Sequence, residues 1–117
     1  MFRKLRTVIY HVDDLQRAKN WYAELTGVQP YFDEIFYVGF DFNGFELGLD
    51  PDFEDVPDRG SQAVAYWKVD DIDLAVKKFS KAGAMMSSKI KDVGAGIKAA
   101  TLIDPWGNAI GLIQEVF

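Results

Sequence analysis

The strongest constraint on the fold is an internal repeat, which divides the chain into two similar halves. The segment His11-Val12-Asp13-Asp14-Leu15 recurs 57 residues later as Lys68-Val69-Asp70-Asp71-Ile72. In each half this segment opens a stretch with helical spacing. Further on, Asp41-Phe42-Asn43-Gly44 corresponds to Asp104-Pro105-Trp106-Gly107, and each of these turns precedes another apolar run. A repeat of this length within 117 residues predicts two copies of one structural unit.

Each copy predicts a strand, a helix and then three strands. In the first copy we expect a strand over about 5–12, a helix ending at Gly27, and strands at about 29–34, 36–42 and 45–50. In the second copy we expect a strand at about 62–69, a helix over 71–82, and strands at about 84–90, 97–103 and 109–116. Asp13 or Asp14 is expected to cap the first helix, because a short carboxylate accepts the free N–H groups of the first turn.

The chain is predicted to form a single domain, 1–117, made of two modules and a connector. Module 1 spans about 1–50, the connector 51–61 and module 2 about 62–117. Two prolines and a dense run of acidic residues oppose regular structure in the connector.

Composition excludes several kinds of chemistry. The chain has no cysteine, which rules out thiol catalysis, disulfides and thiolate metal sites. It has one histidine, His11, so a site with two or three histidine ligands from one chain is impossible. The net charge of −5 disfavours nucleic-acid binding. No apolar run approaches the ~20 residues that span a membrane, and a cytoplasmic protein without a membrane partner is expected.

The duplicated unit, the Val-Asp-Asp helix start in each copy and the turn Asp104-Pro105-Trp106-Gly107-Asn108 resemble the glyoxalase/bleomycin-resistance/dioxygenase superfamily. This superfamily is also called vicinal oxygen chelate. The resemblance implies an α+β fold with two βαβββ modules, whose cupped mixed sheets surround a cavity. It also implies a homodimer. Residues 1–58 carry a net charge of −7 and residues 59–117 a net charge of +2, so the two halves have complementary charges for such an association.

The resemblance also identifies four strand positions from which metal-using members draw their ligands. In this sequence these positions hold Thr7, Glu46, Val64 and Gly111. Glu46 is a good ligand type and Thr7 a poor neutral donor. Val64 and Gly111 offer no side-chain ligand. One carboxylate does not hold a catalytic divalent ion in an open site, so we expect neither a metal ion nor another cofactor.

Five residues are candidates for contacting a small-molecule ligand. The period of two along a strand places them on the sheet faces that should line the cavity. They are His11, Glu46, Tyr66, Lys68 and Thr7. A histidine, a carboxylate, a phenol and an amine around one cavity would suit a polar or anionic small molecule. The alternative is an internal polar network without a ligand.

Three functions are compatible with these residues. The first is metal-free binding or sequestration of a small molecule, and the acidic surface would favour a cationic one. The alternative is a metal-independent isomerase or lyase with His11 or Glu46 as the acid or base. The weaker alternative is a metalloenzyme with a displaced site that uses both residues.

Overall fold

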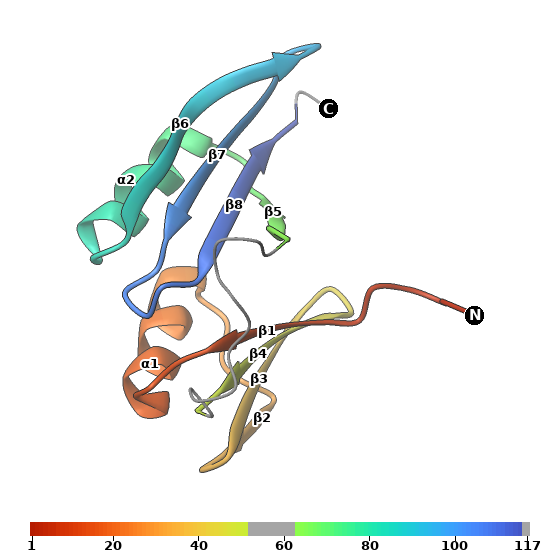
Figure 1. The fold of residues 1–117 in the computed structure, drawn as a ribbon, viewed down its shortest axis with the longest axis vertical. Coiled ribbons are helices and arrows are strands. Elements are labelled where there is room, and N and C mark those ends of the chain that lie inside the picture. Colours follow the sequence, from red (N-terminus) through yellow and green to blue (C-terminus); the bar gives the residue numbers. More distant parts are fainter. Residues whose placement is uncertain (52–62, 116–117) are drawn as a thin grey trace. The chain divides into compact units, whose positions relative to one another are not determined.

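A computed structural model describes residues 1–51 and 63–115. The predicted connector therefore lies, except for Pro51, outside the described residues. The chain divides into two compact units, Met1–Pro57 and Asp58–Phe117, and each is considered by itself (Figure 1).

The first unit has the predicted order of one strand, one helix and three strands. Its elements are β1 (Thr7–His11), α1 (Leu15–Thr26), β2 (Phe32–Glu34), β3 (Tyr37–Phe42) and β4 (Phe45–Asp50). The strand order in the sheet is β1-β4-β3-β2. β1 runs parallel to β4, whereas the other two pairs are antiparallel. The long connection through α1 makes the parallel pairing of β1 with β4 feasible.

Helix α1 covers one face of this sheet. Asp14, rather than Asp13, is its N-cap, and the carboxylate accepts a hydrogen bond from the Arg17 backbone N–H. Gly27 ends the helix in the left-handed conformation (φ 75°), which glycine adopts without a steric penalty. Ala18 and Tyr22 are buried. The core of the unit also contains Tyr10, Val12, Val38, Phe40, Leu47 and Leu49.

The second unit repeats the same topology. Its elements are β5 (Tyr66–Lys68), α2 (Ile72–Lys81), β6 (Met85–Gly94), β7 (Ile97–Ile103) and β8 (Ala109–Gln114). The strand order is β5-β8-β7-β6, again with a parallel pair, here β5 and β8. The predicted α+β fold of two βαβββ modules is therefore confirmed.

Three strands differ from the sequence expectation by three residues or more at one end. β5 begins at Tyr66 rather than near residue 62. β2 begins at Phe32 rather than near residue 29. β6 continues to Gly94 rather than ending near residue 90. The antiparallel pairing with β7 extends that far, through several register shifts, and a tight turn with positive φ at Gly94, Ala95 and Gly96 joins the two strands. Apolar and polar residues do not alternate regularly over β6, because the strand is largely exposed on both faces. The sequence pattern therefore gave no clear end for this strand.

Among the described residues, no helix has the length and apolar character required to cross a membrane.

Candidate functional site

One face of the first sheet is not covered by α1, and we call it the open face. Alternation along the strands places Thr7 and Ile9 of β1 on it, beside Glu46 and Gly48 of β4. The buried Leu47 and Leu49 point to the opposite face. The open face also carries apolar side chains with substantial exposure: 48% for Ile9, 59% for Tyr31 and 38% for Phe32.

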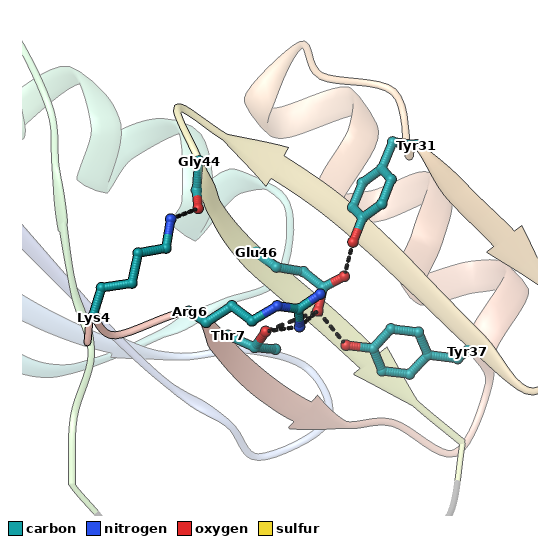
Figure 2. Close-up of polar contacts among 7 residues, drawn as sticks. All are labelled: Lys4, Arg6, Thr7, Tyr31, Tyr37, Gly44 and Glu46. Atoms are coloured by element: carbon teal, nitrogen blue, oxygen red, sulfur yellow. Dashed lines mark hydrogen bonds and ion pairs between the residues drawn. The ribbon is translucent and has the colours of Figure 1, made fainter. Parts of the chain in front are cut away.

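Glu46 lies at the centre of a hydrogen-bonded group on this face, which we call the Glu46 cluster (Glu46, Thr7, Arg6, Tyr31 and Tyr37; Figure 2). Its Oε1 accepts hydrogen bonds from Tyr37 Oη at 2.8 Å and from Thr7 Oγ1 at 3.0 Å. Arg6 Nη1 lies 3.5 Å from the same oxygen. Oε2 accepts a hydrogen bond from the Tyr31 hydroxyl. Four protein donors thus engage the two oxygens, which together offer about four lone-pair positions.

The cluster keeps the carboxylate ionised. The Glu46 side chain is 9% exposed, whereas that of Arg6 is 71% exposed. Burial raises the pKa of Glu46, but hydrogen bonds from Tyr31, Tyr37 and Thr7, together with the Arg6 charge, outweigh it and hold the pKa below its usual value. Burial and the hydrogen bond to Glu46 raise the pKa of Tyr37. The hydrogen bond to Glu46 is the main cause of the raised pKa of Tyr31. Both phenols therefore stay protonated and donate to the carboxylate.

Two glycines make room for this group. Gly39 of β3 and Gly48 of β4 are cross-strand partners. A Cβ atom at Gly48 would overlap the Tyr37 hydroxyl and lie 2.6 Å from Tyr37 Cζ. A Cβ atom at Gly39 would lie 2.6 Å from Glu46 Oε2 and 3.2 Å from Tyr31 Cε1. The missing side chains let the two phenol rings lie close against the sheet backbone.

The structure brings together two of the five predicted ligand residues, Thr7 and Glu46, which are directly paired across β1 and β4. His11 is paired with Asp50, four residues along from that position. At about 3.3 Å per residue this separates His11 from Glu46 by about 13 Å along the strands. A single ion held by both residues, as in the displaced metal site, does not suit this spacing.

Tyr66 and Lys68 lie on β5 of the second unit. Tyr66 is paired with Gly111, and its ring lies over that glycine, because an added Cβ would be 2.6 Å from Tyr66 Cδ1. Lys68 is exposed and paired with Ile113. That these two residues share a cavity with those of the first unit stays a prediction.

Comparisons with known proteins decide the family. The model of the "Glyoxalase/Bleomycin resistance protein/Dioxygenase superfamily" matches residues 4–112. The chain belongs to this superfamily. None of the curated proteins compared with the chain matches it.

Solved structures of the glyoxalase superfamily share the fold. A family enzyme from Burkholderia phytofirmans PsJN has a TM-score of 0.79 at 18% identity, over 96% of this chain and 98% of the other. A glyoxalase-related enzyme from Fulvimarina pelagi has a TM-score of 0.77 at 15% identity, over 97% and 89%. A lactoylglutathione lyase from Agrobacterium tumefaciens has a TM-score of 0.72 at 18% identity, over 95% and 92%. At these identities the likeness concerns the fold.

The residues of this glyoxalase-superfamily chain do not fit the metal ion that some members of the superfamily use. The Glu46 oxygens already accept hydrogen bonds from the protein, and the Arg6 guanidinium supplies the positive charge beside them. Val64 and Gly111 offer no side-chain donor. Among the described residues, no group of three or more histidine, aspartate or glutamate side chains is placed to hold a metal ion.

The register of the second sheet also revises one of the four positions. The repeat makes Tyr66 the counterpart of Ile9, and their partners are Gly111 and Gly48. Gly111 is therefore the counterpart of Gly48, and the residue equivalent to Glu46 is Ala109. Alanine, like glycine, has no side-chain ligand, so the conclusion about the metal is unchanged.

Sequence reasoning missed three members of the Glu46 cluster: Arg6, Tyr31 and Tyr37. Alternation could have indicated Tyr37. It lies two residues before Gly39 on β3 and therefore on the same face as Gly39 and its partner on β4. Tyr31 precedes β2, and its backbone N–H donates to the Gly39 carbonyl. The strand expected at about 29–34 includes Tyr31, and alternation assigns it to the face opposite Phe32. The structure instead leaves Tyr31 outside β2, with its hydroxyl on Glu46. Arg6 lies within the strand expected over about 5–12, where alternation assigns it to the face opposite Thr7, whereas the structure begins β1 at Thr7.

Proposed function

We propose that the open face of the first sheet binds a small organic molecule without a metal ion. The observation that carries this proposal is the Glu46 cluster, which fixes two phenol rings on the face that also carries the exposed apolar side chains of Ile9 and Phe32. Tyr31 is 59% exposed although its hydroxyl is anchored to a buried carboxylate. An aromatic ring that is both exposed and fixed loses little conformational freedom when a ligand packs against it.

The hydrogen-bonding capacity of the cluster indicates how it would meet such a ligand. Each phenol uses its one O–H on Glu46, so its oxygen still has a lone pair to accept a donor from the ligand. Arg6 is 71% exposed and has five N–H donors, of which the cluster uses a fraction. In this proposal Glu46 orients the two tyrosines, and Tyr31, Tyr37 and Arg6 contact the ligand.

The state of Glu46 favours a binding function over catalysis in which Glu46 transfers a proton. A general base works best when its pKa lies near the operating pH, whereas the pKa of Glu46 is held below its usual value. Four donors also occupy its oxygens. Catalysis through His11, as a metal-independent isomerase or lyase, would use a residue four positions along the same strand from Thr7. In that case a stabilising compound would be consumed during the assay.

The test is a thermal-shift screen of aromatic and polar compounds, followed by variants of the open face. A compound that binds the folded state raises the melting temperature in proportion to the logarithm of its concentration over Kd. We expect Tyr31→Ala to raise the Kd of the compound with the largest thermal shift about tenfold, because aromatic contacts contribute on the order of 1 kcal/mol or more. Tyr31→Phe should keep the ring and most of the binding.

The matched control is Tyr66→Ala, which removes an exposed tyrosine (51%) from the second unit. If Tyr66→Ala weakened binding and Tyr31→Ala did not, the ligand would lie on the other sheet. If no compound of any class raised the melting temperature, the proposed function would be wrong.

The proposal also includes a homodimer and a cytoplasmic location. The opposite net charges of the two halves support the dimer, because a two-fold arrangement that places the acidic half of each copy against the basic half of the other is electrostatically favourable.

A further inference from the structure

The hairpin of β2 and β3 carries two exposed phenylalanines that the Glu46 cluster does not account for, and Tyr37 of that cluster lies beside one of them. Phe32, Phe36 and Tyr37 form what we call the hairpin aromatic group. The ring centroids of Phe32 and Phe36 are 5.9 Å apart with planes inclined by 70°. Those of Phe32 and Tyr37 are 6.1 Å apart with planes inclined by 59°. The three rings are therefore arranged edge-to-face or tilted rather than in a parallel stack.

Exposing the Phe32 and Phe36 rings to water is unfavourable in free energy. Phe36 is 63% exposed and Phe32 is 38% exposed. A hairpin turn is usually polar, so two exposed phenylalanines beside each other point to something that packs on them. Tyr37 joins this group to the Glu46 cluster, because the same side chain contacts Phe32 and donates to the Glu46 carboxylate.

The charged side chains on the strands beside the hairpin aromatic group are carboxylates, apart from that of Arg6, just before β1, which is paired with Glu46 next to Tyr37. Glu34 is the cross-strand partner of Tyr37. Asp50 follows Leu49, the partner of Val38, and so lies beside Tyr37 on the neighbouring strand. Asp33 is the strand partner of Val38 and lies on the helix-covered face. There Lys19 Nζ forms an ion pair with Asp33 Oδ2 at 3.0 Å, so this lysine is on the face opposite Tyr37. Residues 1–51, the described part of the first unit, contain five basic and eight acidic residues, a net charge of −3.

Aromatic faces combined with carboxylates are the chemistry that recognises an organic cation. The ring quadrupole attracts a positive charge, and the surrounding carboxylates add long-range attraction. The same unit already shows such a contact, since Lys4 Nζ lies 5.4 Å from the centroid of Phe45. We propose that the hairpin aromatic group binds the ammonium group of a free small molecule. This inference rests on the proposed function and names the ligand class for the same open face.

Choline and 3,3-dimethyl-1-butanol are suitable probes, because they have nearly the same shape and differ in charge. Their dissociation constants are measured by chemical-shift titration of the whole protein. Choline is expected to bind about fivefold more tightly than the alcohol, since cation–π attraction at exposed sites changes binding by about two- to fivefold per ring. Phe32→Leu and Phe36→Leu keep an apolar side chain, and each should raise the Kd of choline about two- to fivefold.

Two controls match these variants. Phe45→Leu changes an exposed phenylalanine (49%) outside the group, and we expect no change in choline binding. Glu34→Gln should raise the Kd of choline. Glu24→Gln makes the same change of charge at an exposed position on α1 and should leave that Kd unchanged. Melting temperatures establish that each variant is folded.

Equal binding of choline and the alcohol, no binding of choline, or unchanged binding in both Phe32→Leu and Phe36→Leu would overturn the inference. If other compounds still bound in a manner that depends on Tyr31, the proposed function would stand without it. If no compound of any class bound, both would fall.

Discussion

Replacing Gly48 with alanine is expected to lower the free energy of unfolding by about 1–3 kcal/mol, the usual cost of forcing an extra group into a packed site. The added Cβ would overlap the Tyr37 hydroxyl, so the ring must leave its place against the sheet. Its hydrogen bond to Glu46 is then lost. Chemical denaturation of the variant and the wild type measures the difference.

Tyr37→Ala provides the matched background. With the ring removed, an alanine at Gly48 has no hydroxyl to displace, and the cost of Gly48→Ala should fall close to zero. The difference between the two backgrounds is the coupling energy of a double-mutant cycle. An equal cost in both backgrounds would show that the glycine is required for a reason other than the Tyr37 ring.

Glu46→Gln is expected to lower the free energy of unfolding at pH 7 by about 1.5–3 kcal/mol, the size of hydrogen bonds to a charged group. The amide nitrogen cannot accept a hydrogen bond, so at least one of the donors around Glu46 loses its acceptor. Arg6 also loses its counter-ion. Glu24→Gln, at an exposed position on α1, is the control and should change stability little.

The effect of Glu46→Gln should depend on pH. Because the pKa of Glu46 is lowered by folding, its carboxylate binds protons less readily in the folded than in the unfolded chain. Its contribution is therefore fully present above the unfolded pKa of about 4.3 and is lost as the pH falls through the folded pKa. The stability difference between wild type and variant should shrink below about pH 4. A constant difference from pH 7 to pH 3 would contradict the pKa direction.

Much of the fold was predictable from the sequence, because its signals are local or repeated. The repeat around Val12 and Val69 marks the start of both helices, and the aspartate caps and Gly27 act within one turn of the chain. Leu47 and Leu49 of β4 and their partners in β3 recur at every second position, because they are buried on the face that α1 covers. In β6 little is buried, and the strand end was misjudged.

The site was harder to predict, because hydrogen bonds between side chains depend on cross-strand neighbours. Alternation placed Glu46 and Thr7 on one face, and the structure joins them. It gave no indication that Tyr31, from the loop after α1, donates to the same carboxylate. A shared face also does not imply contact, since His11 lies on the face of Thr7 but four residues further along β1.

The account is tested most directly by the metal dependence of ligand binding. The compound with the largest thermal shift is titrated into the wild type by calorimetry, first with EDTA and then with excess Mn²⁺ or Zn²⁺. We predict the same Kd within about twofold in both conditions, and about tenfold weaker binding in Tyr31→Ala with EDTA present. Binding that EDTA abolishes and the metal restores would contradict a metal-free site built on the Glu46 cluster.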